Sequence, residues 1–288
     1  MNEKLNGHHI FGGRSLVIAT MHQKESVVAP LLEEELGVKC FTIPTLNTDV
    51  FGTFSGEINR NNSPLQTAKL KAFAAIALCD ATLAIASEGS FGAHPASLFA
   101  TANEELVVLI DTKNQLEIVG RHLTFKTNSS RQEVNNLSDF EEFKIAIGYP
   151  AHGVILKIQH DITNEKVIHK DFASPKELNE IVSSALEKNH KVEVETDMRA
   201  MHNPTRMKAI EQAILDLVKN CNSFCPQCNT AGFTIQSVIS GLPCELCLVP
   251  TKSTKAYRYQ CQKCDFIEER LKDGSGFEDP TFCDYCNP

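Results

Sequence analysis

Four Cys-x-x-Cys pairs near the end of the chain have the spacing of metal-binding turns. The eight cysteines are Cys225, Cys228, Cys244, Cys247, Cys261, Cys264, Cys283 and Cys286. Two intervening residues let one turn direct both sulfur atoms at the same ion, and two such turns complete a tetrahedral thiolate site. We therefore predict two zinc ions. Both are expected to be structural, because a site closed by four thiolates leaves no position for a substrate.

The spacing leaves the partnering of these turns open. Consecutive pairs could share an ion, or the first pair could join the third and the second join the fourth. A redox pair, coincidence and iron–sulfur ligation are the alternatives, and ribbon-type zinc knuckles match the spacing better. Residues 221–288 carry six Lys or Arg and eight Asp or Glu, a net charge of 6 − 8 = −2. This charge disfavours nucleic acid and leaves a protein as the expected partner of the region.

A second group of polar residues follows the first predicted strand, at Thr20, His22 and Lys24. In open α/β sheets, ligands bind at the carboxyl ends of strands, where helix amide groups also attract anions. The cluster therefore indicates an anion-binding turn. The alternative is a capped helix start with solvated charges.

A long polar loop at residues 47–60 contains two carboxylates and a cation, namely Asp49, Glu57 and Arg60. It is longer than a simple connection needs, which favours a role in binding over a flexible surface loop.

Residues 86–95 are predicted as a turn directly after an apolar strand, and they contain Ser87, Glu88, Ser90 and His94. Glu88 at the carboxyl end of a strand is placed to hold a divalent cation, and the neighbouring glycines permit close backbone approach. A purely structural turn is the alternative.

Residues 193–206 lead from a strand into a helix and contain Asp197, Arg199, His202 and Arg206. Two arginines and a histidine beside a helix N-terminus could bind a phosphate or carboxylate. In the alternative interpretation, Asp197 and Arg199 form an internal ion pair.

The elements that must position these residues alternate between strands and helices. Apolar runs predict strands at 15–20, 38–43, 81–86, 106–111, 154–159 and 191–195. Periodicity and capping residues predict helices at 24–36, 63–79, 138–147, 175–189 and 203–220. This order favours an α/β domain at residues 1–217 with a mostly parallel central sheet flanked by helices. A small β-rich, zinc-ribbon-like domain is expected at 218–288.

The totals agree with a globular protein. Of the 288 residues, 42% are hydrophobic and 22% are charged, and the net charge is −8. This charge disfavours nonspecific binding to nucleic acid or to an anionic membrane. The first residues lack a secretory signal and no apolar run is long enough to span a bilayer, so a cytoplasmic location is expected. In a reducing compartment, eleven cysteines are better explained as metal ligands than as disulfides.

The chain also resembles two known groups of proteins. Over nearly its whole length it resembles an uncharacterised bacterial family without an assigned activity. The motifs that carry this resemblance lie at Asn47–Glu57, Ala86–Gly92, Thr196–Ala200 and Cys283–Pro288.

Residues 14–92 are also similar to inosine-triphosphate pyrophosphatases and the related Maf proteins. Those enzymes split a nucleoside triphosphate into monophosphate and pyrophosphate with Mg²⁺ held by carboxylates. The resemblance implies that Thr20 and Lys24 face phosphates, that Lys71 is the helix lysine and that Glu88 is a metal ligand. The position that usually supplies a glutamate is Gln66, so Glu57 or Asp49 would have to replace it.

The sequence therefore predicts a Mg²⁺-dependent hydrolase of a nucleotide or a related phosphorylated small molecule. Its expected catalytic residues are Glu57, Glu88, Lys71 and His94, with Lys24, Arg199 and Arg206 neutralising phosphate. The alternative is a non-enzymatic module that binds a small anion while its zinc domain contacts a protein.

Overall fold

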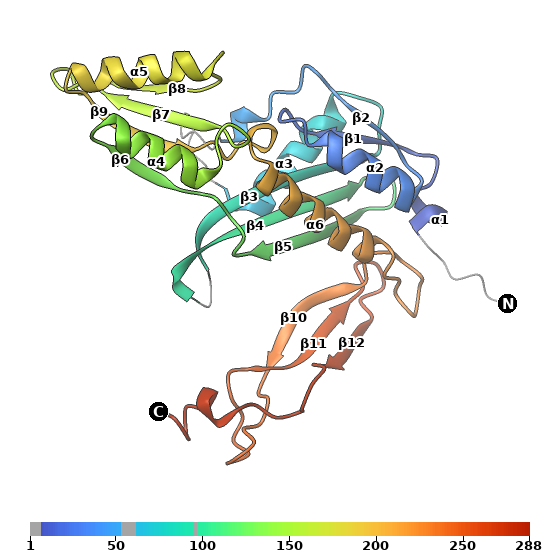
Figure 1. The fold of residues 1–288 in the computed structure, drawn as a ribbon. Coiled ribbons are helices and arrows are strands. Elements are labelled where there is room, and N and C mark those ends of the chain that lie inside the picture. Colours follow the sequence, from blue (N-terminus) through green and yellow to red (C-terminus); the bar gives the residue numbers. More distant parts are fainter. Residues whose placement is uncertain (1–6, 53–61, 95–96) are drawn as a thin grey trace.

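The computed structural model describes residues 7–52, 62–94 and 97–288, with side chains outside 93–100. A five-stranded sheet forms the centre of the larger part (Figure 1). Its strands are β1 (Ser15–Ala19), β2 (Lys39–Thr42), β3 (Leu83–His94), β4 (Ser97–Asp111) and β5 (Leu116–Thr124). The strand order is β2-β1-β3-β4-β5.

This sheet is mixed, so the prediction of a mostly parallel sheet is wrong. β1 is parallel to β2 and β3, whereas β3, β4 and β5 pair in antiparallel fashion. The reason lies in β3, which continues through residues 87–94, the segment predicted as a turn. β4 then pairs back along β3 without a crossover helix, and a strand returning in this way must be antiparallel. Glu88 is therefore a residue of a strand.

Helices cover both faces of the sheet. On one face lie α1 (Gly7–Phe11), α2 (Glu25–Leu36) and α6 (Pro204–Cys221), and on the other lies α3 (Pro64–Ala77). The start of α3 is fixed by a capping box, in which the Ser63 hydroxyl accepts from the Gln66 amide and the Gln66 side chain accepts from the Ser63 amide. Asn203 likewise caps α6 through the Arg206 amide.

A second sheet is entirely antiparallel and has the order β6-β9-β7-β8. It consists of β6 (Arg131–Val134), β7 (Val154–Gln159), β8 (Lys166–His169) and β9 (Lys191–Thr196). α4 (Leu137–Ile147) and α5 (Pro175–Glu187) pack on it through a separate apolar core that includes Phe140, Leu178 and Val182. α4 begins at an Asn136 cap, two residues before the predicted Ser138.

The C-terminal region contains a third, antiparallel sheet of β10 (Thr234–Ser240), β11 (Thr254–Gln260) and β12 (Ile267–Leu271). It extends away from the end of α6 (Figure 1). Short 3-10 turns complete the fold at Asp49–Phe51, Ala200–His202 and Pro280–Phe282. Across the described ranges, no helix combines the length and apolarity needed to cross a membrane.

Candidate functional site

The eight paired cysteines form two clusters of four. The first pair joins the third, as Cys225, Cys228, Cys261 and Cys264, and the second joins the fourth, as Cys244, Cys247, Cys283 and Cys286. Four Sγ–Sγ distances, two in each cluster, are 3.7, 3.5, 3.8 and 3.6 Å. Four sulfur atoms around a tetrahedral ion with bonds of about 2.3 Å would lie about 3.8 Å apart. Both clusters therefore have the geometry to hold a metal ion.

The backbone shapes each Cys-x-x-Cys turn. In the first turn, the Asn229 amide donates to the Cys225 carbonyl oxygen at 2.9 Å, and in the second the Leu248 amide donates to Cys244 at 3.0 Å. The residue after the second cysteine is left-handed in three turns, with φ of 57° at Asn229, 63° at Leu248 and 54° at Asp265. Asn and Asp tolerate this conformation better than Leu, whose β-carbon crowds the following carbonyl.

The two clusters lie at opposite ends of the C-terminal sheet. β10 runs from the first cluster towards the second and β11 returns, so about 23 Å of strand separates them. The first cluster is attached to the central sheet, because the Gln262 side-chain amide exchanges hydrogen bonds of 3.1 and 2.8 Å with the backbone of Glu117 in β5. Gly232 packs on Ile118 so closely that a β-carbon would approach Ile118 to 2.9 Å.

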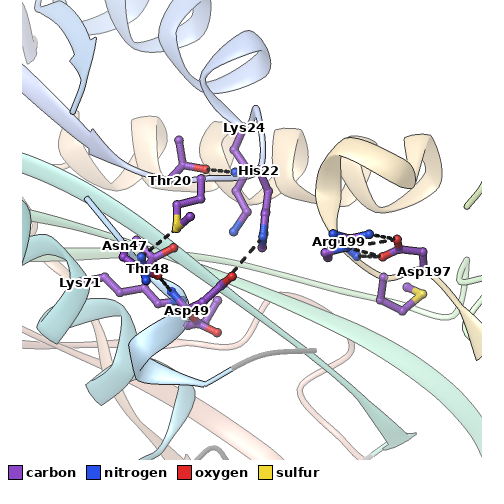
Figure 2. Close-up of polar contacts among 12 residues, drawn as sticks. Thr20, His22, Lys24, Asn47, Thr48, Asp49, Lys71, Asp197 and Arg199 are labelled. Atoms are coloured by element: carbon purple, nitrogen blue, oxygen red, sulfur yellow. Dashed lines mark hydrogen bonds and ion pairs between the residues drawn. The ribbon is translucent and has the colours of Figure 1, made fainter. Parts of the chain in front are cut away.

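A second candidate site is a charged cavity at the edge of the central sheet. Its volume is about 20 Å³, enough for one water molecule or a small ion. Residues from β1, the loop before α3, α3 itself and β3 line it, including Thr20, His22, Lys24, Asp49, Lys71, Ser87 and Glu88. Figure 2 shows the His22 ring directed at Asp49.

Strand alternation in β3 brings cations to both faces of the sheet. Ser87 faces α2, and its hydroxyl accepts a hydrogen bond from Lys24 Nζ at 2.9 Å. Glu88 faces α3, where it forms an ion pair with Lys71. All four side chains are buried. The two buried ammonium groups thus flank one strand, although they come from different helical segments.

Two lysines and two carboxylates line the cavity, but only Lys71 forms an ion pair with one of them, Glu88. Lys24 Nζ also donates to the Ser87 carbonyl at 3.4 Å, but no described carboxylate lies within ion-pair distance of it. Burial, followed by the positive charge of Arg206, lowers the pKa of Lys24 to about 7. Burial and the charge of Lys24 lower the pKa of His22 to about 3, so its imidazole is neutral near pH 7. An anion bound in the cavity would place a negative charge directly beside Lys24 Nζ.

A fully buried ion pair lies nearby on the α6 face. Arg206 Nε donates to Glu105 Oε1 at 2.8 Å, and Arg206 also donates to the Met198 carbonyl. Gly89 makes room for this pair, because a β-carbon there would lie 2.5 Å from Glu105 Oε1. Glu105 was missed in the sequence. A carboxylate directly before the apolar run Leu106–Ile110 is the signal that could identify it.

Arg199 lies in a separate cluster to one side of the cavity (Figure 2). It pairs with Asp197 at 2.7 Å and with Asp171 at 2.6 Å, and His202 Nε2 lies 3.0 Å from Asp171. The alternative of an internal Asp197–Arg199 ion pair is therefore the arrangement observed. Asp171, Asp197 and His202 are close enough to share a cation, but the guanidinium of Arg199 already forms ion pairs with both carboxylates. Asp171 was not among the residues predicted.

The structure thus gathers part of the predicted site. Seven of the residues line one cavity, namely Thr20, His22, Lys24, Asp49, Lys71, Ser87 and Glu88. The remaining predicted residues are placed otherwise. Asp197, Arg199 and His202 form the separate cluster, Arg206 is paired with Glu105, and Ser90 lies further along β3. Glu57, Arg60 and the side chain of His94 lie outside the described residues.

A larger cavity lies elsewhere in the described part of the chain. It has a volume of about 790 Å³ and lies between β5, the end of α6 and the C-terminal sheet, lined by residues such as Arg121, Lys219 and Tyr259. It contains none of the predicted site residues. Several charges on its wall are already paired, Lys69 with Glu117 and Arg270 with Glu268. Volume alone therefore does not identify the site with the most reactive chemistry.

Comparisons with known proteins give a family but no activity. A family model described as a domain of unknown function, DUF6671, matches residues 71–288. No curated protein matches the chain. Among solved structures, the crystal structure of protein VC0702 from Vibrio cholerae shares 9% identity, with 72% of this chain and 93% of that chain covered. Its TM-score of 0.33 is too low to support a common fold.

Proposed function

The chain belongs to the DUF6671 family, and because that family's description names no activity, we propose a function from the charged cavity itself. The chain binds a phosphorylated small molecule, a nucleotide or a related compound, and hydrolyses it with Mg²⁺. The observation that carries this proposal is the buried ammonium of Lys24, which has hydrogen bonds only to a neutral serine among the described residues.

The electrostatics of the cavity support an anionic ligand. A buried ammonium without a direct ion-pair partner is unfavourable, and burial together with the charge of Arg206 lowers the pKa of Lys24. A phosphate oxygen beside Lys24 Nζ would provide that partner and return the lysine to its charged form. The Thr20 hydroxyl and the neutral His22 imidazole line the same cavity and can donate hydrogen bonds to further phosphate oxygens.

The donor set also fits Mg²⁺. This ion is usually held by one or two carboxylates together with substrate phosphates. Asp49 lines the cavity with a side chain 37% exposed, so its carboxylate is open to an ion. Glu88 would supply a second oxygen while Lys71 keeps its charge balanced. When bound, Mg²⁺ would polarise the phosphoryl group and lower the pKa of a coordinated water.

Within this mechanism, the chain's own residues orient the substrate and the attacking water. Lys24 and Lys71 balance the negative charge on the phosphate. His22 lies 3.8 Å from Asp49 and is uncharged near pH 7, so its ring can orient an attacking water through a hydrogen bond. The role predicted for Glu57 remains a prediction.

We also propose that both cysteine clusters hold Zn²⁺. Tetrahedral coordination by four thiolates is typical of structural zinc, and the sulfur separations fit its bond length. Buried apolar residues around the first cluster are few, chiefly Phe233. The ions would therefore supply much of the folding free energy of this region.

Phosphate release tests the enzymatic proposal. The purified chain is incubated with a panel of nucleoside mono-, di- and triphosphates with and without Mg²⁺, and released phosphate and pyrophosphate are measured. We expect Mg²⁺-dependent release that Lys24→Met and Glu88→Gln each lower by at least about a hundredfold. Lys69→Met is the matched control on α3, because Lys69 pairs with Glu117 outside the cavity. The proposal would be rejected if the chain binds no nucleotide of the panel and releases neither phosphate nor pyrophosphate from any of them.

A second function is favoured by the small volume of the cavity. About 20 Å³ admits a single small group, which also suits a module that senses a small anion without turnover. In that case pyrophosphate or phosphate binds to the wild-type chain and not to Lys24→Met, while no nucleotide is hydrolysed.

A further inference from the structure

The two cysteine clusters differ in the residues that their turns present to solvent. In the first cluster, the third position of each Cys-x-x-Cys turn is polar, with Gln227 and Lys263. In the second cluster the same positions are apolar, with Leu246 at 73% exposure and Tyr285 at 75%. Both turns of the second cluster surround one ion position, so these side chains lie at the same end of the molecule.

The backbone adds an independent observation. Leu248 follows the second cysteine of its turn and is left-handed, with φ of 63°, yet it is 64% exposed. The equivalent residues in the first cluster are Asn229 and Asp265, which adopt this conformation at lower cost. An exposed leucine in an unfavourable conformation contributes little to the fold. Backbone strain of this kind is more common at binding sites than elsewhere.

Only the first cluster has a partner within the described part of the chain. Gln262 and Gly232 attach it to β5. The second cluster lies at the far end of the C-terminal sheet, close to the C-terminus (Figure 1). We call its exposed apolar residues the distal patch. They are Leu246, Leu248, Val249, Phe282 and Tyr285.

The distal patch is surrounded by acidic residues. Residues 241–253 and 272–288 contain two lysines and five Asp or Glu, a net charge of 2 − 5 = −3. Four thiolates around a divalent ion add about −2. Two of the acids stand directly beside the apolar positions, since Glu245 precedes Leu246 and Asp284 precedes Tyr285. Asp284 pairs with Lys252, whereas the Glu245 side chain has no partner among the described residues.

We propose that the distal patch is a docking surface for a protein segment that combines apolar side chains with Lys or Arg. The apolar residues would bind by burial, and the acidic rim would select basic flanks. The negative charge disfavours nucleic acid and anionic lipid. It also disfavours a second copy, because two patches of the same charge would face each other. This surface is independent of the hydrolase proposed for the cavity.

A random-peptide selection tests the proposal. A displayed library of twelve-residue peptides is selected against the full chain carrying its metal ions, and the affinity of one selected peptide is measured by fluorescence anisotropy. We expect the selected sequences to be enriched in Lys or Arg next to apolar residues. Replacing the basic residues of the peptide by Glu should weaken binding at least about tenfold.

Matched variants locate the binding surface. Leu246→Ser with Tyr285→Ser should weaken binding at least about tenfold, whereas Gln227→Ser with Lys263→Ser, at the same positions of the first cluster, should not change it. An unchanged metal content shows that both double variants remain folded. Failure to select peptides, selection of acidic peptides, or equal affinity of the Leu246/Tyr285 variant would overturn the proposal. It would also be overturned if the wild-type chain self-associates through the patch and the double variant is a monomer.

Discussion

The cysteine clusters and the charged cavity both join residues that are far apart in the chain, but different forces bring them together. Each cysteine pair is set by a turn of four residues, and only the choice of partner turn depends on the sheet that carries it. The cavity depends on strand register, because Lys24 meets Ser87 and Lys71 meets Glu88 on opposite faces of β3. Local turns thus fix the ligands of a metal site, whereas long-range packing fixes a buried charge cluster.

Removal of the metal ions gives the sharpest test of this difference. Cys261→Ser, or chelation of the wild-type chain, should unfold residues 225–288, because structural zinc contributes about 10–16 kcal/mol to small domains. The central sheet has its own core, so its backbone amides should remain protected from hydrogen exchange. Hydrogen exchange followed by mass spectrometry measures both regions in one experiment. If both regions lost protection together, or neither did, the contrast between them would be wrong.

The buried pair of Arg206 and Glu105 should give the next largest effect. Both side chains are fully buried, and Arg206→Met would leave Glu105 as an uncompensated buried charge, which costs about 3–5 kcal/mol. Denaturant unfolding gives this value. Adding Glu105→Leu should restore most of the loss. Arg258→Met removes an exposed pair with Glu269 and serves as the control, with an effect below about 1 kcal/mol.

Replacing Lys24 should raise stability, whereas replacing Arg206 lowers it, because Lys24 has no carboxylate partner among the described residues. Its pKa is near 7 in the folded chain and 10.5 in the unfolded chain, so between these values the unfolded state binds more protons and stability rises with pH. Lys24→Met should therefore raise the free energy of unfolding by about 1–3 kcal/mol at pH 6. This gain should largely disappear by pH 10.

Unfolding curves at pH 6, 8 and 10 measure the gain of the Met variant, and calorimetry with pyrophosphate measures binding. We expect a more stable variant that no longer binds the anion. A variant that is destabilised at pH 6 would show that Lys24 has a structural counter-charge.

The sequence predicts the two cysteine clusters better than the charged cavity. The cysteine spacing identified all eight residues of the two clusters, and the capping residues Ser63, Ser174 and Asn203 identified three helix starts. β3 is longer than the sequence predicts, because residues 87–92 are polar or glycine apart from Phe91 and so favour a turn. Those residues continue the strand by pairing with β4, while Lys24 and Lys71 contact the buried Ser87 and Glu88 side chains. No local pattern contains that information.

The other differences between the sequence prediction and the structure arise from residues that are far apart in the chain but in contact in the fold. Glu105 and Asp171 were missed because their arginine partners are 101 and 28 residues away along the chain. The cysteine spacing does not determine which turns share an ion, because this depends on β10 and β11. These strands carry the second pair away from the first and bring the third pair back to it. In each case the missing information is the register between strands.

The smallest effect concerns the contact between the two regions. Gln262→Ala removes two hydrogen bonds to the β5 backbone, and we expect a loss of about 1 kcal/mol with unchanged metal content. Thermal unfolding of this variant is compared with Gln227→Ala, a residue without a described partner in the same cluster. A loss of metal from Gln262→Ala would show that the clusters depend on long-range packing too.

The proposed function requires the buried ammonium of Lys24 to bind an anion. An NMR titration of this ammonium, with and without the anion, measures its pKa directly. The signal is assigned by its absence in Lys24→Met. We predict that Lys24 titrates near pH 7 in the free chain and at least about one unit higher in the presence of saturating pyrophosphate, because a bound anion favours the charged form. Titration near its ordinary value of 10.5 in the free chain, unchanged by pyrophosphate, would contradict this role of Lys24.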